Sequence, residues 1–151
     1  MLRVRCQATA TLDDKGRVAL PAPIRKALGE AEVSQLVLIC QDEAIRGYTP
    51  EDFHAEVEAP LRNVDPRSPE ARAWVDAYVR WAQDAEIDNQ GRIRIPPDLR
   101  SDAGLGREVI ISVVLGHIEI SDKGRLEERR RKALAEAAAM PFTPGWQAGP
   151  R

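Results

Sequence analysis

The chain has 151 residues, of which 43% are hydrophobic and 30% are charged, as expected for one ordinary globular domain or two small ones. The formal net charge of −2 argues against a uniformly basic nucleic-acid-binding surface, and no stretch approaches the roughly 18 apolar residues of a membrane helix. We therefore expect a cytoplasmic protein with no membrane partner, in which Cys6 and Cys40 are small buried hydrophobic residues, because their spacing fits no zinc site.

The first predicted unit covers residues 7–54 and has the order ββαββ. Its first turn follows the pattern Asp13-Asp-Lys-Gly16, in which glycine can adopt a positive φ and the aspartate side chain can accept backbone N–H groups. Pro21 and Pro23 end the second strand and start a short helix. Gly29 is expected to supply the left-handed residue after that helix. The predicted strands occupy residues 7–12, 17–20, 36–40 and 44–48.

A helical linker is predicted at residues 55–82. A helix begins at Thr49-Pro50 and runs to about Arg62, and a second begins at Ser68-Pro69. The second has an apolar face, which we expect to pack against the barrel or a neighbouring subunit. A base-stacking role is disfavoured because the segment is acidic. The apolar face consists of Ala71, Trp74, Val75, Tyr78 and Val79.

The second unit, residues 83–126, repeats the first. The segment from Asp88 to Gly104 matches the segment from Asp13 to Gly29 at a constant offset of 75, without a gap. Its strands are predicted at 84–88, 92–95, 109–115 and 117–121. A C-terminal helix and a flexible tail are expected at 127–151. The identical pairs are Asp13/Asp88, Gly16/Gly91, Arg17/Arg92, Pro21/Pro96, Arg25/Arg100 and Gly29/Gly104.

The repeated motif resembles the SpoVT/AbrB domain, and two copies in one short chain resemble the MraZ family, over about residues 3–134. The resemblance implies a mixed, mainly β fold, in which the two repeats form a double-split, swapped-hairpin β-barrel with a helical linker and a C-terminal helix. It also implies a ring-like homo-oligomer in the cytoplasm, associated with the nucleoid. The expected function is transcriptional regulation, through repeated promoter elements of the division and cell-wall gene cluster.

Arg17 and Arg92 are the first candidates for DNA contact, because each follows a turn glycine and offers a planar fork of donors to guanine or phosphate. The local charge favours this role, since the first 28 residues carry six basic side chains against two acidic ones. Asp13, Gly16, Asp88 and Gly91 are assigned to turn structure. Further DNA-binding candidates are Lys15, Arg94, Arg25 and Arg100, of which the last two have ion pairing within the fold as an equal alternative.

No arrangement of nucleophiles, acids or histidines suggests catalysis, a metal site or a cofactor. His54 and His117 stand apart from any second ligand at metal spacing. Two other functions stay open beside promoter binding. One is an AbrB-type antitoxin that wraps a toxin with a disordered tail, and the other is an assembly module that has lost DNA contact.

Overall fold

The computed structural model describes residues 1–140, so the predicted flexible tail lies largely outside the described residues. The first repeat comprises β1 (Gln7–Thr11), β2 (Arg17–Ala19), α1 (Ala22–Glu30), β3 (Gln35–Gln41) and β4 (Ala44–Tyr48). The linker comprises α2 (Pro50–Phe53), the π-helical turn His54–Glu58, α3 (Ala59–Arg62), α4 (Pro69–Ala77) and the 3-10 turn Val79–Trp81. The second repeat comprises β5 (Gln83–Glu86), β6 (Arg92–Arg94), α5 (Pro97–Asp102), β7 (Glu108–Val114) and β8 (His117–Asp122), followed by α6 (Lys123–Ala139).

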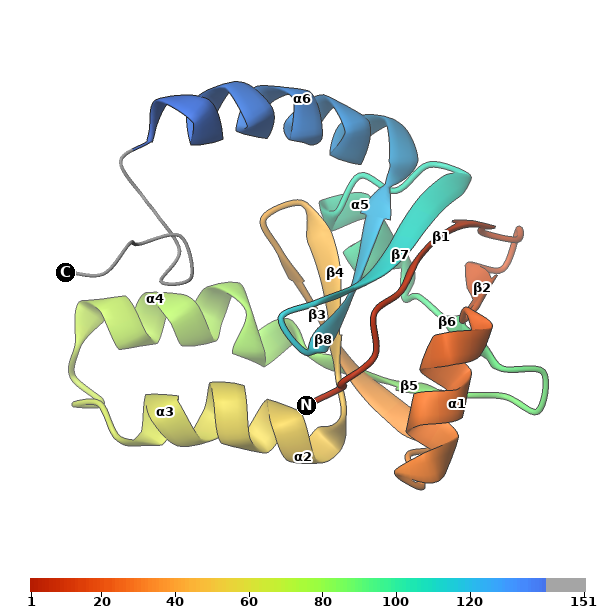
Figure 1. Ribbon diagram of the computed structural model, residues 1–151. Helices are drawn as coiled ribbons and strands as arrows, with labels where there is room; N and C mark the ends of the chain where they lie inside the picture. The colour runs from red at the N-terminus through yellow and green to blue at the C-terminus, as the bar shows by residue number, and fades with distance from the viewer. Residues whose placement is uncertain (141–151) are drawn as a thin grey trace, which may run out of the picture.

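The strands of the two repeats interleave. A six-stranded antiparallel sheet has the order β1-β7-β8-β4-β3-β5, and β2 and β6 form a separate antiparallel ribbon (Figure 1). Strand β1 of the first repeat thus pairs with β7 of the second, and β5 of the second pairs with β3 of the first. The prediction of a mixed, mainly β fold built from two repeats is confirmed.

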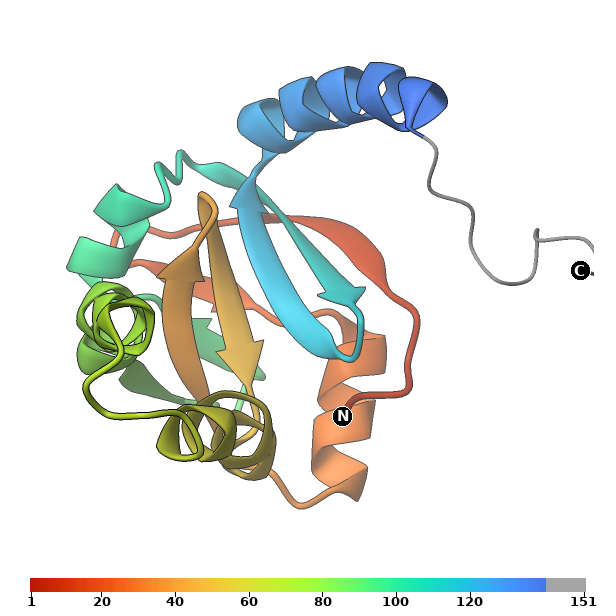
Figure 2. The ribbon, with the colours of Figure 1, turned by 90° about the vertical axis from the view of Figure 1, so that its left-hand side faces the viewer.

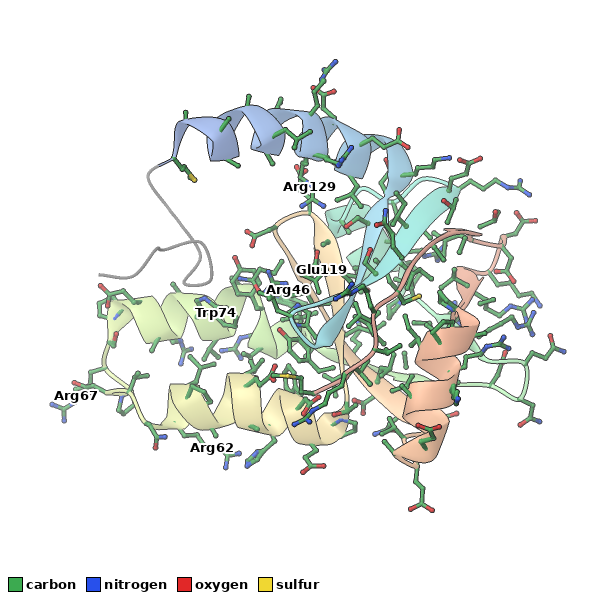
Figure 3. The ribbon with its side chains drawn as sticks, in the orientation of Figure 1. Arg46, Arg62, Arg67, Trp74, Glu119 and Arg129 are labelled. Carbon is green, nitrogen blue, oxygen red and sulfur yellow. The ribbon has the colours of Figure 1, made fainter. Side chains whose placement is uncertain are left out.

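At two places, equivalent residues of the two repeats pair with each other across neighbouring strands. Val18 lies opposite Ile93 in the ribbon, and Arg46 lies opposite Glu119 where β4 pairs with β8. Figure 3 shows the Arg46 and Glu119 side chains close together near the middle of the sheet. Both pairs join residues at equivalent places in the repeated strands, so an approximate twofold axis relates the two halves of the chain.

The main hydrophobic core draws on strands of both repeats, in which alternate side chains point to the same face of the sheet. Val18, Ile93, Ile45 and Ile111 are all at most 1% exposed within it. A second apolar cluster lies between β3, β4 and the linker helices, which Figure 2 shows side by side with these strands. Its buried members are Val37, Ile39, Tyr48, Phe53 and Val57, and Trp74, Tyr78 and Val79 pack against them.

The linker helices begin where the sequence predicts, and their apolar face packs on the chain's own sheet. The Thr49 hydroxyl accepts a hydrogen bond from the Asp52 N–H at 3.0 Å, and the Ser68 hydroxyl accepts one from the Ala71 N–H at 3.3 Å. Such side-chain caps satisfy backbone donors that a helix start leaves free. None of the helices within residues 1–140 has the length and apolar character needed to cross a membrane.

The predicted role of Gly29 is wrong. Gly29 lies inside α1, and the left-handed residue after this helix is Glu32, with φ of +56°. In the second repeat Gly104 has that role, with φ of +62°. The reason is that α1 has nine residues and α5 has six, so one extra helical turn breaks the gapless alignment of the repeats before Gly29.

The two cysteines are half-buried rather than fully buried. Cys6 and Cys40 both pack against the main core, and neither forms a disulfide. Burial raises the pKa of the Cys40 thiol. Nearby carboxylates, of which Asp102 has the largest effect, raise it further. Both residues therefore act as small hydrophobic side chains, as the sequence suggests, but they lie at the edge of the main core rather than inside it.

Candidate nucleic-acid interface

The first turn, which we define as Asp13–Arg17, is held by the side chain of Asp13. One carboxylate oxygen accepts hydrogen bonds from the backbone N–H groups of Lys15 and Arg17, at 2.9 and 2.8 Å. The backbone closes through the Gly16 N–H to the Asp13 carbonyl at 3.0 Å, with Gly16 at φ of +78°. The strands that this turn connects do not pair with each other, because β1 pairs with β7 and β2 pairs with β6, so the turn is not the loop of a hairpin.

The second turn, Asp88–Arg92, has the same construction. Asp88 accepts from the backbone N–H groups of Gln90 and Arg92, both at 2.9 Å, and Gly91 has φ of +72°. In both turns the second carboxylate oxygen of the aspartate accepts from the Nε of the arginine. The distances are 2.7 Å from Arg17 to Asp13 and 3.0 Å from Arg92 to Asp88. The aspartate of each turn thus holds the arginine of the same turn through its Nε, and the terminal nitrogens take no part in that hydrogen bond.

Hydrogen bonds to the charged form lower the pKa of both aspartates. The backbone N–H of Arg17 is the largest influence on Asp13, and the backbone N–H of Arg92 is the largest on Asp88. Burial opposes these bonds in each case, and the arginine side chains add to them. Both carboxylates are therefore charged at neutral pH, so each brace is complete there.

This arrangement predicts how the turns respond to acid. Because the pKa of each aspartate is lower in the folded protein than in the unfolded chain, the bracing is fully present above about pH 4 and is lost as the pH falls through the folded value. We expect carboxyl carbon NMR titrations of Asp13 and Asp88 to have midpoints below about 3.9, the usual pKa of an aspartate side chain. Midpoints at or above that usual value would contradict the bracing.

The β2–β6 ribbon presents a basic outer face. Val18 and Ile93 are buried on its inner side, whereas Ala19 and Arg94 are exposed and Arg17 and Arg92 are half-buried. The register places Arg17 directly opposite Arg94 and Ala19 opposite Arg92. Like charges in directly opposed positions destabilise a strand pair unless another group neutralises them. The ion pair between Arg17 and Asp13 offsets this repulsion in the pair of Arg17 and Arg94.

The remaining candidates surround the ribbon. Lys15 is exposed in the first turn, and the Arg94 Nε donates to its carbonyl oxygen at 3.2 Å. Arg25 on α1 and Arg100 on α5 lie against turn glycines of the opposite repeat. Arg107 was missed by the sequence analysis, yet it lines the same hollow as Asp13 and Arg100. No signal marks it in the sequence, because it stands in the loop before β7, outside the repeated motif.

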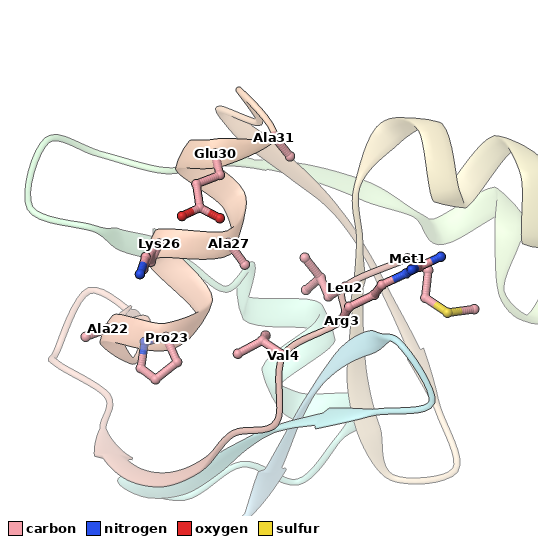
Figure 4. Close-up of a pocket in the computed structure, with 10 residues that line it drawn as sticks. All are labelled: Met1, Leu2, Arg3, Val4, Ala22, Pro23, Lys26, Ala27, Glu30 and Ala31. Atoms are coloured by element: carbon pink, nitrogen blue, oxygen red, sulfur yellow. The ribbon is translucent and has the colours of Figure 1, made fainter.

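A groove beside the N-terminal segment has a different character. It has a volume of about 830 Å³ and lies between residues 1–4 and one face of α1 (Figure 4). Aliphatic side chains dominate its lining, with Arg3, Lys26 and Glu30 as the charged residues and no cysteine or histidine. Across residues 1–140, no group of three or more His, Cys, Asp or Glu side chains is placed to hold a metal ion.

Comparison with known proteins shows the family of this chain. A family model described as MraZ protein, antitoxin-like, matches residues 7–73 and again residues 79–143, so it covers both repeats. The chain belongs to the MraZ family. Relatives named transcriptional regulator MraZ include one from Thermus thermophilus, 38% identical over 136 residues and 89% of each chain. Another, from Syntrophobacter fumaroxidans, is 36% identical over 119 residues and 79% of each chain.

The match extends through the whole repeated architecture. A third relative, from Acetivibrio thermocellus, is 36% identical over 136 residues, which are 86% of this chain and 92% of the relative. MraZ relatives are named as transcriptional regulators and not as enzymes. These names agree with the interpretation, made from the sequence, that the chain is not an enzyme.

Proposed function

We propose that this protein is a transcriptional regulator that binds double-stranded promoter DNA through the β2–β6 ribbon and its two flanking turns. The observation that carries the proposal is the outer face of the ribbon, where three arginines project from a short two-stranded element with braced turns. A two-stranded ribbon fits the major groove of B-DNA, where arginine forms bidentate contacts with guanine. The names of the MraZ relatives support the regulatory role.

Within this proposal the basic residues have different tasks. Arg17 and Arg92 are oriented by Asp13 and Asp88, so we assign base recognition to them. Lys15 and Arg94 are exposed beside them and suit phosphate contact, which positions a protein on the duplex without reading sequence. Gln90 replaces Lys15 in the second turn, so the two turns offer DNA different surfaces.

We also propose that binding requires assembly into a ring-like homo-oligomer acting in the cytoplasm at the nucleoid. One chain contributes a single three-residue ribbon, which is a small contact area for a specific protein–DNA interface. Several copies held in one assembly would engage repeated promoter elements together, and the second and later contacts would then be intramolecular. Multivalent binding of this kind would explain why a promoter needs several copies of the element for tight binding.

The test uses DNA fragments selected from a genomic library by the full-length protein. Duplexes with one, two and three copies of the recovered element are titrated by fluorescence anisotropy at fixed salt. We expect affinity to rise about a hundredfold or more from one copy to three, and the dependence on salt concentration to count the phosphate contacts. Equal affinity for all three duplexes would contradict multivalent binding.

Absence of any selected DNA would contradict the proposed function itself. Recovery of a small toxin from a pull-down would then favour an antitoxin, in line with the antitoxin-like description of the family model. Recovery of only further copies of this chain would favour the assembly module.

A further inference from the structure

Each turn rests on an arginine that belongs to the other repeat. A Cβ placed on Gly16 would lie 2.6 Å from Cζ and 2.9 Å from Nε and Nη1 of Arg100, so the guanidinium group covers this glycine. On Gly91, a Cβ would collide with Cδ of Arg25 and lie 3.2 Å from its Nη1. Only a glycine allows either arginine to approach so closely.

The backbone makes the same crossed connection. The Gly16 carbonyl accepts a hydrogen bond from the Ile95 N–H at 2.8 Å, and the Gly91 carbonyl accepts one from the Leu20 N–H at 2.9 Å. Ile95 leads into α5, which carries Arg100, and Leu20 leads into α1, which carries Arg25. Turn, strand end and arginine thus form one crossed unit on each side of the pseudo-twofold axis.

The charge of these arginines is not used within the fold. Among residues 1–140, neither Arg25 nor Arg100 forms an ion pair within 4.0 Å, and the Nε of Arg100 is buried without a hydrogen-bond partner. Ion pairing, one of the two roles that the sequence left open for them, is therefore not what the structure shows. Their contacts with the opposite turn are steric.

The first turn receives an additional contact. The side chain of Arg94 in the second repeat donates to the Lys15 carbonyl, whereas the matching residue of the first repeat is Ala19, which has no side-chain donor to offer Gln90. Gly16 is accordingly buried, and Gly91 is only half-buried. The first turn is covered by two arginines of the second repeat, and the second turn by one arginine of the first.

We infer that Arg100 and Arg25 are positioning residues that hold the DNA-facing turns of the opposite repeat. This inference rests on the proposed DNA-binding function. Arg100 fixes the first turn and thereby Arg17, and Arg25 fixes the second turn and thereby Arg92. Gly16 and Arg100 are 84 positions apart in the sequence, and Gly91 and Arg25 are 66 positions apart. Direct phosphate contact by Arg100 and Arg25 is the competing role, and the experiments below separate the two.

The first measurement is amide hydrogen exchange on the full chain without DNA. We expect Arg100→Ala to speed exchange of the Gly16 and Arg17 amides about tenfold, with no change at Gly91 and Arg92. Arg25→Ala should give the mirror result. Unchanged exchange at the facing turn, or equal acceleration at both turns, would overturn the inference whether or not the protein binds DNA.

Two controls keep this measurement specific. Arg67→Ala removes an exposed arginine at the far end of the linker, remote from the ribbon (Figure 3), and should leave both turns unchanged. The amide of Ile111, in the middle of the sheet, reports whether a variant is folded. Arg100→Lys keeps the charge and loses the planar group, so it should behave as Arg100→Ala does.

The second measurement is a double-mutant cycle in promoter affinity. If Arg100 acts through the first turn, adding Arg100→Ala to Arg17→Ala should cost nothing further, whereas its effect should add fully to that of Arg92→Ala. Arg100→Lys should fail to restore affinity. A phosphate contact would instead give additive losses in both pairs, rescue by lysine and a salt slope lower by about one, and those results would overturn the positioning role.

Discussion

Replacing Arg17 and Arg92 together by alanine is expected to weaken promoter binding by at least about thirtyfold, because two bidentate base contacts are worth roughly 1 to 3 kcal/mol each. The fold should survive. Both side chains are about one-third exposed and pair with aspartates that are 36% and 40% exposed, and such pairs contribute about 1 kcal/mol or less. Anisotropy titrations and thermal melts of the same samples measure both quantities.

The matched control for this pair is Arg67→Ala, which removes the same kind of exposed side chain far from the ribbon. It should bind promoter DNA as the unmodified protein does. If the double variant keeps both its melting temperature and its promoter affinity, the ribbon does not read DNA. The assembly module would then be the better description of this protein.

Gly16→Val and Gly91→Val should each destabilise the protein by about 3 kcal/mol or more. A β-branched side chain is strained at the φ values of +78° and +72° found there. Its Cβ would also meet the side chain of Arg100 or Arg25, and overpacking adds a further cost. Chemical denaturation gives the free energy of unfolding directly.

Gly29 provides the control for these two variants. It lies within α1 at a negative φ, and a Cβ placed on it would meet nothing within 4 Å. Gly29→Val should change the free energy of unfolding by about 0.5 kcal/mol or less, because valine is no worse than glycine within a helix. A loss at Gly29 as large as at Gly16 would mean that neither positive φ nor crowding explains the turn glycines.

The helices and turns could be predicted from the sequence because the residues that start or end each of them lie within it or next to it. The Asp-x-x-Gly turns, the prolines that start α1 and α5, and the capping residues Thr49 and Ser68 all act within a few residues of themselves. Even so, the helix after the first turn was placed to end too early, since nothing at Gly29 distinguishes a helix interior from a helix end. Only the tertiary structure reveals the extra turn of α1.

The candidate site was only partly predictable. Arg17 and Arg92 were found because the repeat marks them twice, and their pairing with aspartates follows from short-range geometry. The contact of Arg100 with Gly16 depends on which strands pair across the two repeats, and periodicity carries no information about that choice. The expectation that Arg25 and Arg100 were equally suited to ion pairing or phosphate contact reflects this limit.

The interleaved sheet also has a consequence for biosynthesis. Strand β1 pairs Gln7 with Ser112, so β1 has no partner on the ribosome until about 100 further residues have been made. Loop closure over so many residues slows folding, and strands left without partners are prone to aggregate. The first repeat therefore cannot complete its fold before β7 has been synthesised. Strand β1 has to stay soluble until β7 emerges. The polar side chains of Gln7, Thr9 and Thr11 on β1 disfavour its aggregation in the meantime.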